Sequence, residues 1–218
     1  VTIILIVLVA FGAAVFLYTQ GWGYPSQDQV VEQLFSDPKA AFASEVTEEN
    51  ATRIGMIVGT SEGALGPSCE FQSIIAEKGN AGGSAFKFPN TVYNAAGGYL
   101  SICAGIKGYN VTVTNGAQSG LQSVAYAMQV IRNGWEDAML ATGTDENSEI
   151  ISELYGKLNL TADEKVRPYE EKERFSLSDG SVSALLETVD SAKARGAELL
   201  CRVTGYGMAH ASVPFGKI

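Results

Sequence analysis

The chain has 218 residues, of which 46% are hydrophobic and 18% are charged, a size and composition typical of one well-buried globular domain. Its formal net charge of −9 argues against binding to nucleic acid, whose phosphates need a basic surface. The three cysteines lack metal-ligand spacing and there is one histidine, so we expect no metal site and no cofactor. We expect a cytoplasmic protein with reduced, mostly buried thiols.

The first eighteen residues, Val1 to Tyr18, are almost entirely apolar and allow two interpretations. Their length is close to that of a membrane span, which needs about 20 residues. Alternatively, the Val- and Ile-rich run from Thr2 to Ala10 is a buried strand. We favour the strand, because an α/β core needs a central strand, and we keep the membrane segment as the alternative.

The next part of the chain alternates between helix and strand signals. A capping box at Ser26 to Gln29 predicts a helix that begins before Val30. Further along, we expect a buried strand over Arg53–Thr60, a helix over Ser68–Lys78 and a helix over Thr91–Ile106 that stops at Gly108. The glycine-rich turn after the strand lacks Gly-Lys-Ser/Thr, so it is not a phosphate-binding loop.

The second half of the chain continues this alternation. Its expected elements are a strand over Val111–Thr114, a helix ending at Asn133-Gly134, a strand over Asp137–Asp145, a helix over Glu149–Leu158, and strands over Ser181–Val189 and Glu198–Ala209 that flank a short helix over Asp190–Gly196. Strands alternating with helices indicate a layered α/β fold, with a mostly parallel mixed sheet and helices on its faces.

The stretch "VTVTNGAQSGLQSV" joins a strand to a helix through a turn of small residues. Such turns present a nucleophile above a helix N-terminus, yet the residue at the apex is Ala117. Ser119 or Cys69 could serve as nucleophile instead, but Ser119 is out of register for the Gly-x-Ser-x-Gly motif and only His210 could act as base. The acidic pair Asp145–Glu146 is more typical of a helix cap than of a metal site.

The order of several segments resembles the N-terminal half of thiolase-fold β-ketoacyl synthases. The segments are "IGMIVGTSEG", "FPNTVYNAAGGYLSICAGIKG", "VTVTNGAQSGLQSVAYAMQVIRNGWEDAMLATGTDE", "VRPYEEKERFSLSDGSVSALLET" and "SAKARGAELLCRVTGYGMAH". The resemblance covers Arg53 to His210 and implies a single domain of this type over residues 1–218.

In that family the turn carries the acyl-accepting cysteine, and counting back from Gly120-Leu121 places this cysteine's position at Ala117. A thiolate there needs the helix N-terminus and backbone N–H groups. The family's two histidines and lysine come from its C-terminal half, and their motifs are absent from these 218 residues. The resemblance therefore implies no catalytic residue here and a chain that is not an enzyme on its own.

The closest resemblance is to the chain-length-factor subunits of type II polyketide and aryl-polyene ketosynthases, which lack the cysteine. It implies a partner ketosynthase in a heterodimer, and an acyl carrier protein reached through that partner. The implied dimer interface is the strand Val111, Thr112, Val113, Thr114 and Asn115. The implied tunnel-wall residues are Ser68, Cys69, Phe71, Gln72 and Gln118, although Phe71 and Ile75 could equally be core.

Two alternatives stay open beside this interpretation. The first is a catalytic condensing enzyme or acyl hydrolase that uses Ser119 or Cys69. The second is a ketosynthase fragment in which the cysteine was replaced by Ala117 through engineering. Substrate, chain length and product do not follow from the sequence.

Overall fold

The computed structural model describes the backbone of residues 3–8 and the full residues 46–162 and 176–209. Its elements are β1 (Ile3–Leu8), η2 (Ala51–Arg53), β2 (Ile54–Gly59), α3 (Leu65–Lys78), η3 (Asn80–Gly82), η4 (Phe88–Thr91), α4 (Ala95–Ala104), β3 (Asn110–Val113), α5 (Ser119–Arg132), β4 (Ala138–Asp145), α6 (Glu149–Lys157), β5 (Gly180–Thr188), α7 (Val189–Ala194) and β6 (Cys201–Val203). The expected helix after Ser26 and the position of His210 lie outside the described residues.

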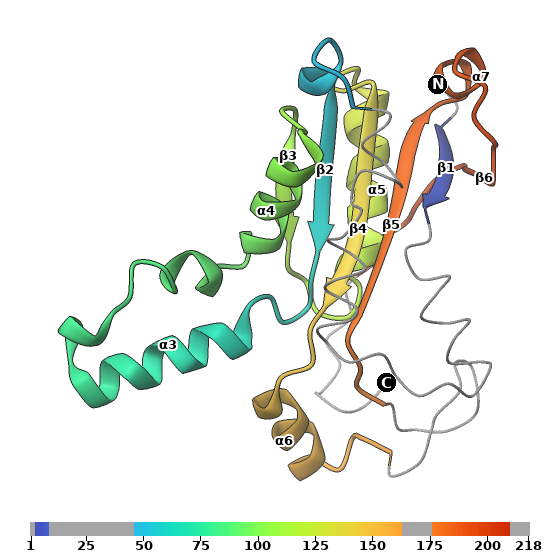
Figure 1. Ribbon diagram of the computed structural model, residues 1–218. Coiled ribbons are helices and arrows are strands. Elements are labelled where there is room, and N and C mark those ends of the chain that lie inside the picture. The colour runs from blue at the N-terminus through green and yellow to red at the C-terminus, as the bar shows by residue number, and fades with distance from the viewer. Residues whose placement is uncertain (1–2, 9–45, 163–175, 210–218) are drawn as a thin grey trace, which may run out of the picture.

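The strands form one mixed sheet of six strands in the order β3-β2-β4-β5-β1-β6 (Figure 1). β2 pairs in parallel with both β3 and β4, whereas β5 runs antiparallel to β4 and to β1, and β6 runs antiparallel to β1. Four strands therefore point one way and two the other. The layered α/β fold is as expected, but the parallel neighbours are confined to the β3-β2-β4 part.

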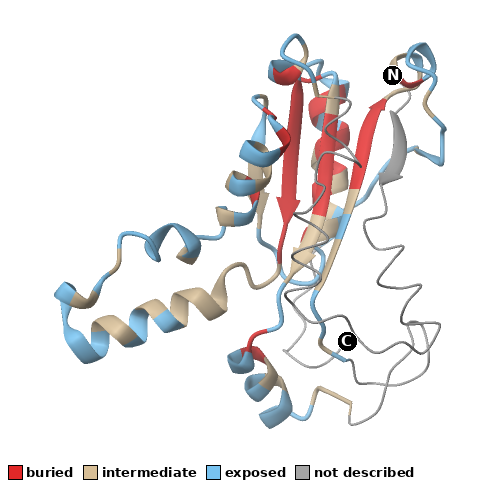
Figure 2. Ribbon diagram, viewed as in Figure 1, coloured by how far each residue is buried: buried red, intermediate tan, exposed pale blue. Residues whose placement is uncertain are grey.

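The core lies on both faces of β2, β4 and β5, because alternate side chains of a strand point to opposite faces. Ile57, Met139 and Leu186 pack against Met128 and other residues of α5 on one face. On the other face, Met56, Val58, Leu140 and Leu185 pack with Ala104 of α4 and with Ile106. Figure 2 shows the buried residues concentrated along β2, β4 and the upper part of β5. Burial on both faces explains the continuous apolar run of β2.

The N-terminal apolar run supplies β1, which takes the fifth place in the sheet rather than a central one. Its register against β5 pairs Ile3 with Thr188 and Leu8 with Ser183. The rest of the stretch up to Tyr18 lies outside the described residues. The described part of the chain includes no helix long and apolar enough to cross a membrane.

Helix α4 is shorter than expected and ends earlier. It spans Ala95–Ala104, and its stop is Gly105, whose φ of +70° lies in the left-handed region that glycine enters without steric cost. Gly108 has a different role, because a Cβ there would lie 2.5 Å from the carbonyl oxygen of Ile54. The glycine at 108 therefore lets the chain approach β2 closely before β3 begins.

Helix α3 leaves the sheet and contains no buried residue. Together with η3 and η4 it forms a projecting segment, residues 65–91, which we call the α3 arm. In the view of Figure 1 the α3 arm extends away from the sheet on the side of the edge strand β3. Within the α3 arm, the rings of Phe71 and Phe88 lie 6.0 Å apart between centroids, Ser68 Oγ donates to the carbonyl of Thr91 at 2.6 Å, and Lys87 pairs with Glu70.

Candidate functional site

The β3–α5 turn (residues 114–118) is closed by the side chain of the first residue of α5. Ser119 is 1% exposed, and its hydroxyl accepts from the backbone N–H of Asn115 and donates to the carbonyl of Gly116, each at 2.7 Å. Gly116 supplies the left-handed conformation, with φ of +61°. Ala117 follows on the exposed side of the turn. The sequence therefore builds the turn from local hydrogen bonds and leaves residue 117 accessible.

Three glycines bring the N-terminus of α5 against the ends of β2 and β4. A Cβ on Gly59 would lie 2.1 Å from the carbonyl oxygen of Ser119, so only glycine fits at the end of β2. Gly120 of α5 and Gly143 of β4 also face each other, and a Cβ on Gly143 would lie 3.1 Å from the Cα of Gly120. This packing places the N-terminus of α5, the positive end of the helix dipole, beside Ala117.

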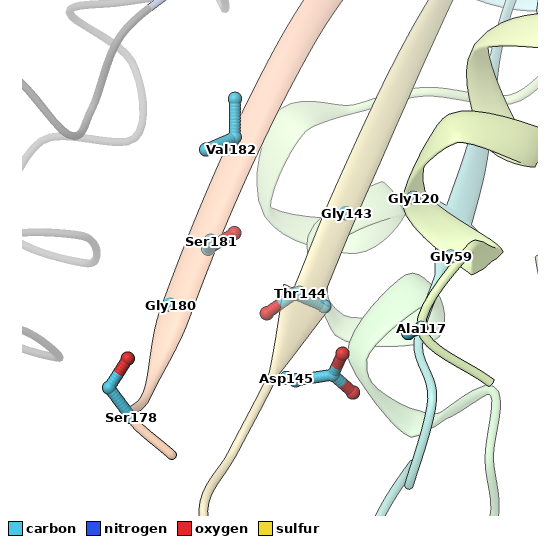
Figure 3. Close-up of a pocket in the computed structure, with 10 residues that line it drawn as sticks. All are labelled: Gly59, Ala117, Gly120, Gly143, Thr144, Asp145, Ser178, Gly180, Ser181 and Val182. Atoms are coloured by element: carbon cyan, nitrogen blue, oxygen red, sulfur yellow. The ribbon is translucent and has the colours of Figure 1, made fainter. Parts of the chain in front are cut away.

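A cleft of about 240 Å³ lies at this point, where β2, β4 and α5 meet the start of β5. Figure 3 shows its lining, which consists of Gly59, Ala117, Gly120, Gly143, Thr144, Asp145, Ser178, Gly180, Ser181 and Val182. Most lining residues are small, and the polar side chains among them are Thr144, Asp145, Ser178 and Ser181. Ser178 and Ser181 were not predicted from the sequence. Ser181 reaches the cleft because the antiparallel pairing of β5 with β4 places it opposite Thr144, and Ser178 lies just before β5.

Asp145, at the end of β4, holds the β2–α3 turn (residues 60–64). Its carboxylate accepts from the hydroxyl of Thr60 at 2.8 Å, from the hydroxyl of Ser61 at 2.6 Å and from the backbone N–H groups of Ser61 and Glu62 at 2.7 and 3.3 Å. The expected helix cap at Asp145–Glu146 is therefore wrong. Helix α6 is capped instead by Ser148, whose hydroxyl accepts from the N–H of Ile151.

Tyr155 of α6 reaches the same turn from the other side, where its hydroxyl donates to the Glu62 carboxylate at 3.4 Å. Burial raises the pKa of the Tyr155 phenol, and the negative charge of Glu62 raises the same pKa further. The phenol therefore stays protonated and can act as the donor. Among the described residues, no cluster of three or more His, Cys, Asp or Glu side chains could hold a metal ion.

The residues proposed as a tunnel wall lie on two parts of the chain. Ser68, Cys69, Phe71 and Gln72 lie on the α3 arm, and Gln118 lies in the β3–α5 turn. None of these five lines the cleft beside Ala117. The alternative that Phe71 and Ile75 belong to the core is wrong, because both are only half-buried on α3.

The structure also shows the surroundings of the alternative nucleophiles, Ser119 and Cys69. The Ser119 hydroxyl is enclosed and occupied by its two hydrogen bonds, which fit a structural role in the turn. Cys69 lies half-buried on the α3 arm, and Cys103 and Cys201 are exposed, so the prediction of mostly buried thiols is wrong. The only histidine, at position 210, lies outside the described residues. Ala117 thus remains the residue that the fold presents at the cleft.

The fold and the site together define a class, namely α/β proteins that present one residue of a strand–turn–helix junction beside a helix N-terminus. Comparison with known proteins makes the class specific. Residues 30–192 match the family model of the β-ketoacyl synthase N-terminal domain. The chain belongs to the β-ketoacyl synthase family through this domain.

Individual relatives agree with this assignment. The chain is 32% identical over 172 residues to 3-oxoacyl-[acyl-carrier-protein] synthase 2 of Vibrio harveyi, covering 75% of this chain and 41% of that protein. The protein of the same name from Vibrio cholerae is 33% identical over 172 residues, covering 75% and 42%. The chain therefore spans less than half the length of these relatives.

A solved structure described as the ishigamide ketosynthase/chain length factor has the same fold, with a TM-score of 0.65 and 23% identity over 74% of this chain and 41% of that one. The curated relatives are named as synthases, which corrects one prediction. The expectation that this chain is not an enzyme on its own is wrong by that comparison.

Proposed function

We propose that the chain works within a β-ketoacyl synthase, as the chain-length-factor-like subunit of a ketosynthase pair that elongates polyketide or polyene chains. In this proposal it pairs with a ketosynthase, meets the acyl carrier protein through that partner, and contributes to the wall of the acyl tunnel. The carrying observation is Ala117, a side chain without a nucleophile at the exposed apex of an otherwise intact turn. An acyl group cannot be attached at this position, so we assign the acyl-bearing thiol to the partner.

The edge of the sheet supports the pairing part of the proposal. β3 stands at the end of the strand order and pairs only with β2 among the described strands. Its sequence, Asn110 to Val113, contains no charge that would block the addition of another strand. An uncharged strand edge of this kind is a template for pairing with another chain. The interface proposed for Val111 to Asn115 follows from this edge.

The α3 arm supports the tunnel part of the proposal. A 14-residue helix without a buried residue gains little stability from its own chain, because most helical stability in proteins comes from packing. Phe86, between η3 and η4, is 94% exposed, and Phe88 is 56% exposed. A partner paired along β3 would lie on the side toward which the α3 arm extends (Figure 1). Ser68, Cys69, Phe71 and Gln72 would then face the partner.

Co-expression tests the proposal directly. The tagged chain is expressed with a full-length ketosynthase, and the complex is purified and sized by light scattering. We expect a stable pair of the two chains in equal amounts. A chain that stays monomeric in the presence of that ketosynthase would contradict the proposal.

Acylation of the complex separates the two subunits' roles. After incubation with an acyl-thioester of the carrier protein, intact mass spectrometry should find the acyl adduct on the partner chain. An adduct on this chain instead would identify it as the acyl-bearing subunit, through Ser119, Cys69 or another residue. The chain-length-factor-like role would then be wrong.

A further inference from the structure

The β2–α3 turn fixes the direction in which the α3 arm leaves the sheet. Since α3 contains no buried residue, its own packing does little to set that direction. The α3 arm is joined to the body at two places, this turn before Leu65 and the segment that returns to α4 after Thr91. Whatever holds the turn therefore holds the base of the α3 arm.

Most of the hydrogen bonds that hold the turn converge on one carboxylate. The four bonds that Asp145 accepts come from Thr60, Ser61 and Glu62, which are consecutive residues of the turn. Hydrogen bonds to an ionised carboxylate are about twice as strong as neutral ones. The Thr60 hydroxyl extends the network, because it also accepts from the N–H of Gly63 at 2.9 Å.

Near the end of the turn, the backbone conformation and a neighbouring aromatic ring require a glycine. Gly63 has φ of +62°, and a Cβ there would lie 2.2 Å from the ring of Tyr93, which lies in the segment between the α3 arm and α4. The Asp145 carboxylate therefore holds the start of the turn, and the glycine at 63 lets its end pack against the ring of Tyr93. Asp145 also lines the cleft beside Ala117, so one residue contacts both the β2–α3 turn and this cleft.

We propose that Asp145 is a positioning residue whose carboxylate sets the orientation of the α3 arm relative to the sheet. Its consequence for chain length rests on the proposed function, in which the α3 arm walls the partner's tunnel. The positioning itself does not depend on that function and can be measured on the chain alone. Asp145 touches no reacting group in this proposal and acts through the β2–α3 turn.

Hydrogen exchange of the full chain tests the positioning. In Asp145→Asn the side chain keeps its shape but loses its charge, and its amide hydrogens oppose the donors of the turn. We expect amide exchange in the first turns of α3 to be about tenfold faster, with exchange in α5 unchanged. Asp179→Asn is the matched control, because the Asp179 carboxylate accepts from the N–H of Asn147 at 2.6 Å and has no bond to the turn.

Two results would overturn the proposal. One is unchanged exchange in α3, and the other is equal acceleration in α3 and α5, which would indicate general destabilisation. Should Asp145→Asn fail to fold, Ser61→Ala replaces it, because this change removes one donor to the carboxylate and leaves the backbone bond. Ser61→Ala should accelerate α3 exchange in the same direction by a smaller factor, and no effect would again overturn the positioning.

The complex with the ketosynthase tests whether the orientation of the α3 arm affects the length of the product chain. We expect Asp145→Asn to shift the distribution of product chain lengths and Asp179→Asn to leave this distribution unchanged. A distribution that Asp145→Asn does not change would contradict the link to the tunnel. If no complex forms at all, the proposed function fails, and the exchange experiment still decides the role of Asp145.

Discussion

At the scale of single residues, the junction beside Ala117 is built by groups other than residue 117 itself. Ser119 closes the β3–α5 turn with two hydrogen bonds, and Gly59 admits the backbone of α5 to the end of β2. Replacing the residue at the apex removes none of these contacts. A turn that can present a nucleophile therefore persists with an alanine in place, and the chemistry of position 117 can be tested by restoring a thiol.

The variant Ala117→Cys should carry an unusually reactive thiol. A helix N-terminus lowers the pKa of a cysteine thiol from about 8.5 into the range of about 3.5 to 7.5. We expect alkylation by iodoacetamide at pH 7 to be about tenfold faster at position 117 than at Cys103, which is exposed in the last turn of α4. Peptide mass spectrometry over time gives both rates in one sample. Equal rates would show that the helix N-terminus does not activate this position.

The variant Gly59→Ala should be strongly destabilised. Its Cβ would overlap the carbonyl of Ser119, a backbone atom that cannot rotate away, so α5 must shift. We expect the free energy of unfolding to fall by about 3 kcal/mol, measured by urea denaturation. Gly98→Ala is the control, because a Cβ at this position of α4 meets no atom within 4 Å and alanine favours a helix by about 1 kcal/mol. Similar losses in both variants would contradict the close-packing account.

At the scale of elements, a side-chain network joins β5 to α7. Glu187 is 2% exposed, and its carboxylate accepts from Arg195 Nε at 2.8 Å and from the Ser191 hydroxyl at 2.8 Å. Thr188 caps α7 by accepting from the N–H of Ser191 at 3.2 Å. A buried carboxylate without its cation is costly, so this network holds α7 on the end of β5.

The variant Arg195→Ala should lower the free energy of unfolding by about 3 kcal/mol, because it leaves the Glu187 carboxylate buried without its cation. Thermal and urea unfolding measure the loss. Lys157→Ala is the control, since Lys157 pairs with Glu153 on an exposed helix face, where such pairs contribute less than about 0.5 kcal/mol. If the two variants lost the same stability, the burial of Glu187 would not be what makes its pair important.

At the scale of the whole molecule, the described structure leaves an open strand and a projecting helix on the same side of the sheet (Figures 1 and 2). The N–H groups of Met56 and Thr60 bond to the carbonyls of Tyr109 and Val113. Because strand residues alternate in direction, the peptide groups of Asn110 and Thr112 face away from β2. These groups are available to a further strand, as the proposed pairing requires.

The variant Thr112→Pro should separate folding from pairing. Proline removes an N–H that faces away from β2, and edge strands tolerate proline at such positions. We expect the circular dichroism spectrum to be unchanged and the affinity for the ketosynthase to fall at least about tenfold, as measured by sedimentation. Thr112→Val keeps the N–H and should pair as the unchanged chain does. Pairing that survives the proline would place the interface away from β3.

The sequence by itself determined the elements, because helices and strands follow from the spacing of apolar residues within a few positions of one another. The buried run of β2, the helix that ends before Gly134, and the alanine at the apex of the β3–α5 turn were all predictable in this way. Family resemblance then fixed the fold. The end of α4 was predicted at Gly108, whereas the helix stops at Gly105. The local pattern does not distinguish a glycine that ends a helix in the left-handed conformation from one that lets two backbone segments approach closely.

The tertiary structure decided what depends on residues far apart in the chain. Asp145 meets Thr60 and Ser61 only because β4 pairs with β2, and Ser181 reaches the cleft only because β5 runs antiparallel to β4. The open edge at β3 and the lack of buried residues on α3 likewise follow from the sheet order and from the course of the chain. Such contacts depend on the packing of distant segments, which local sequence patterns do not encode.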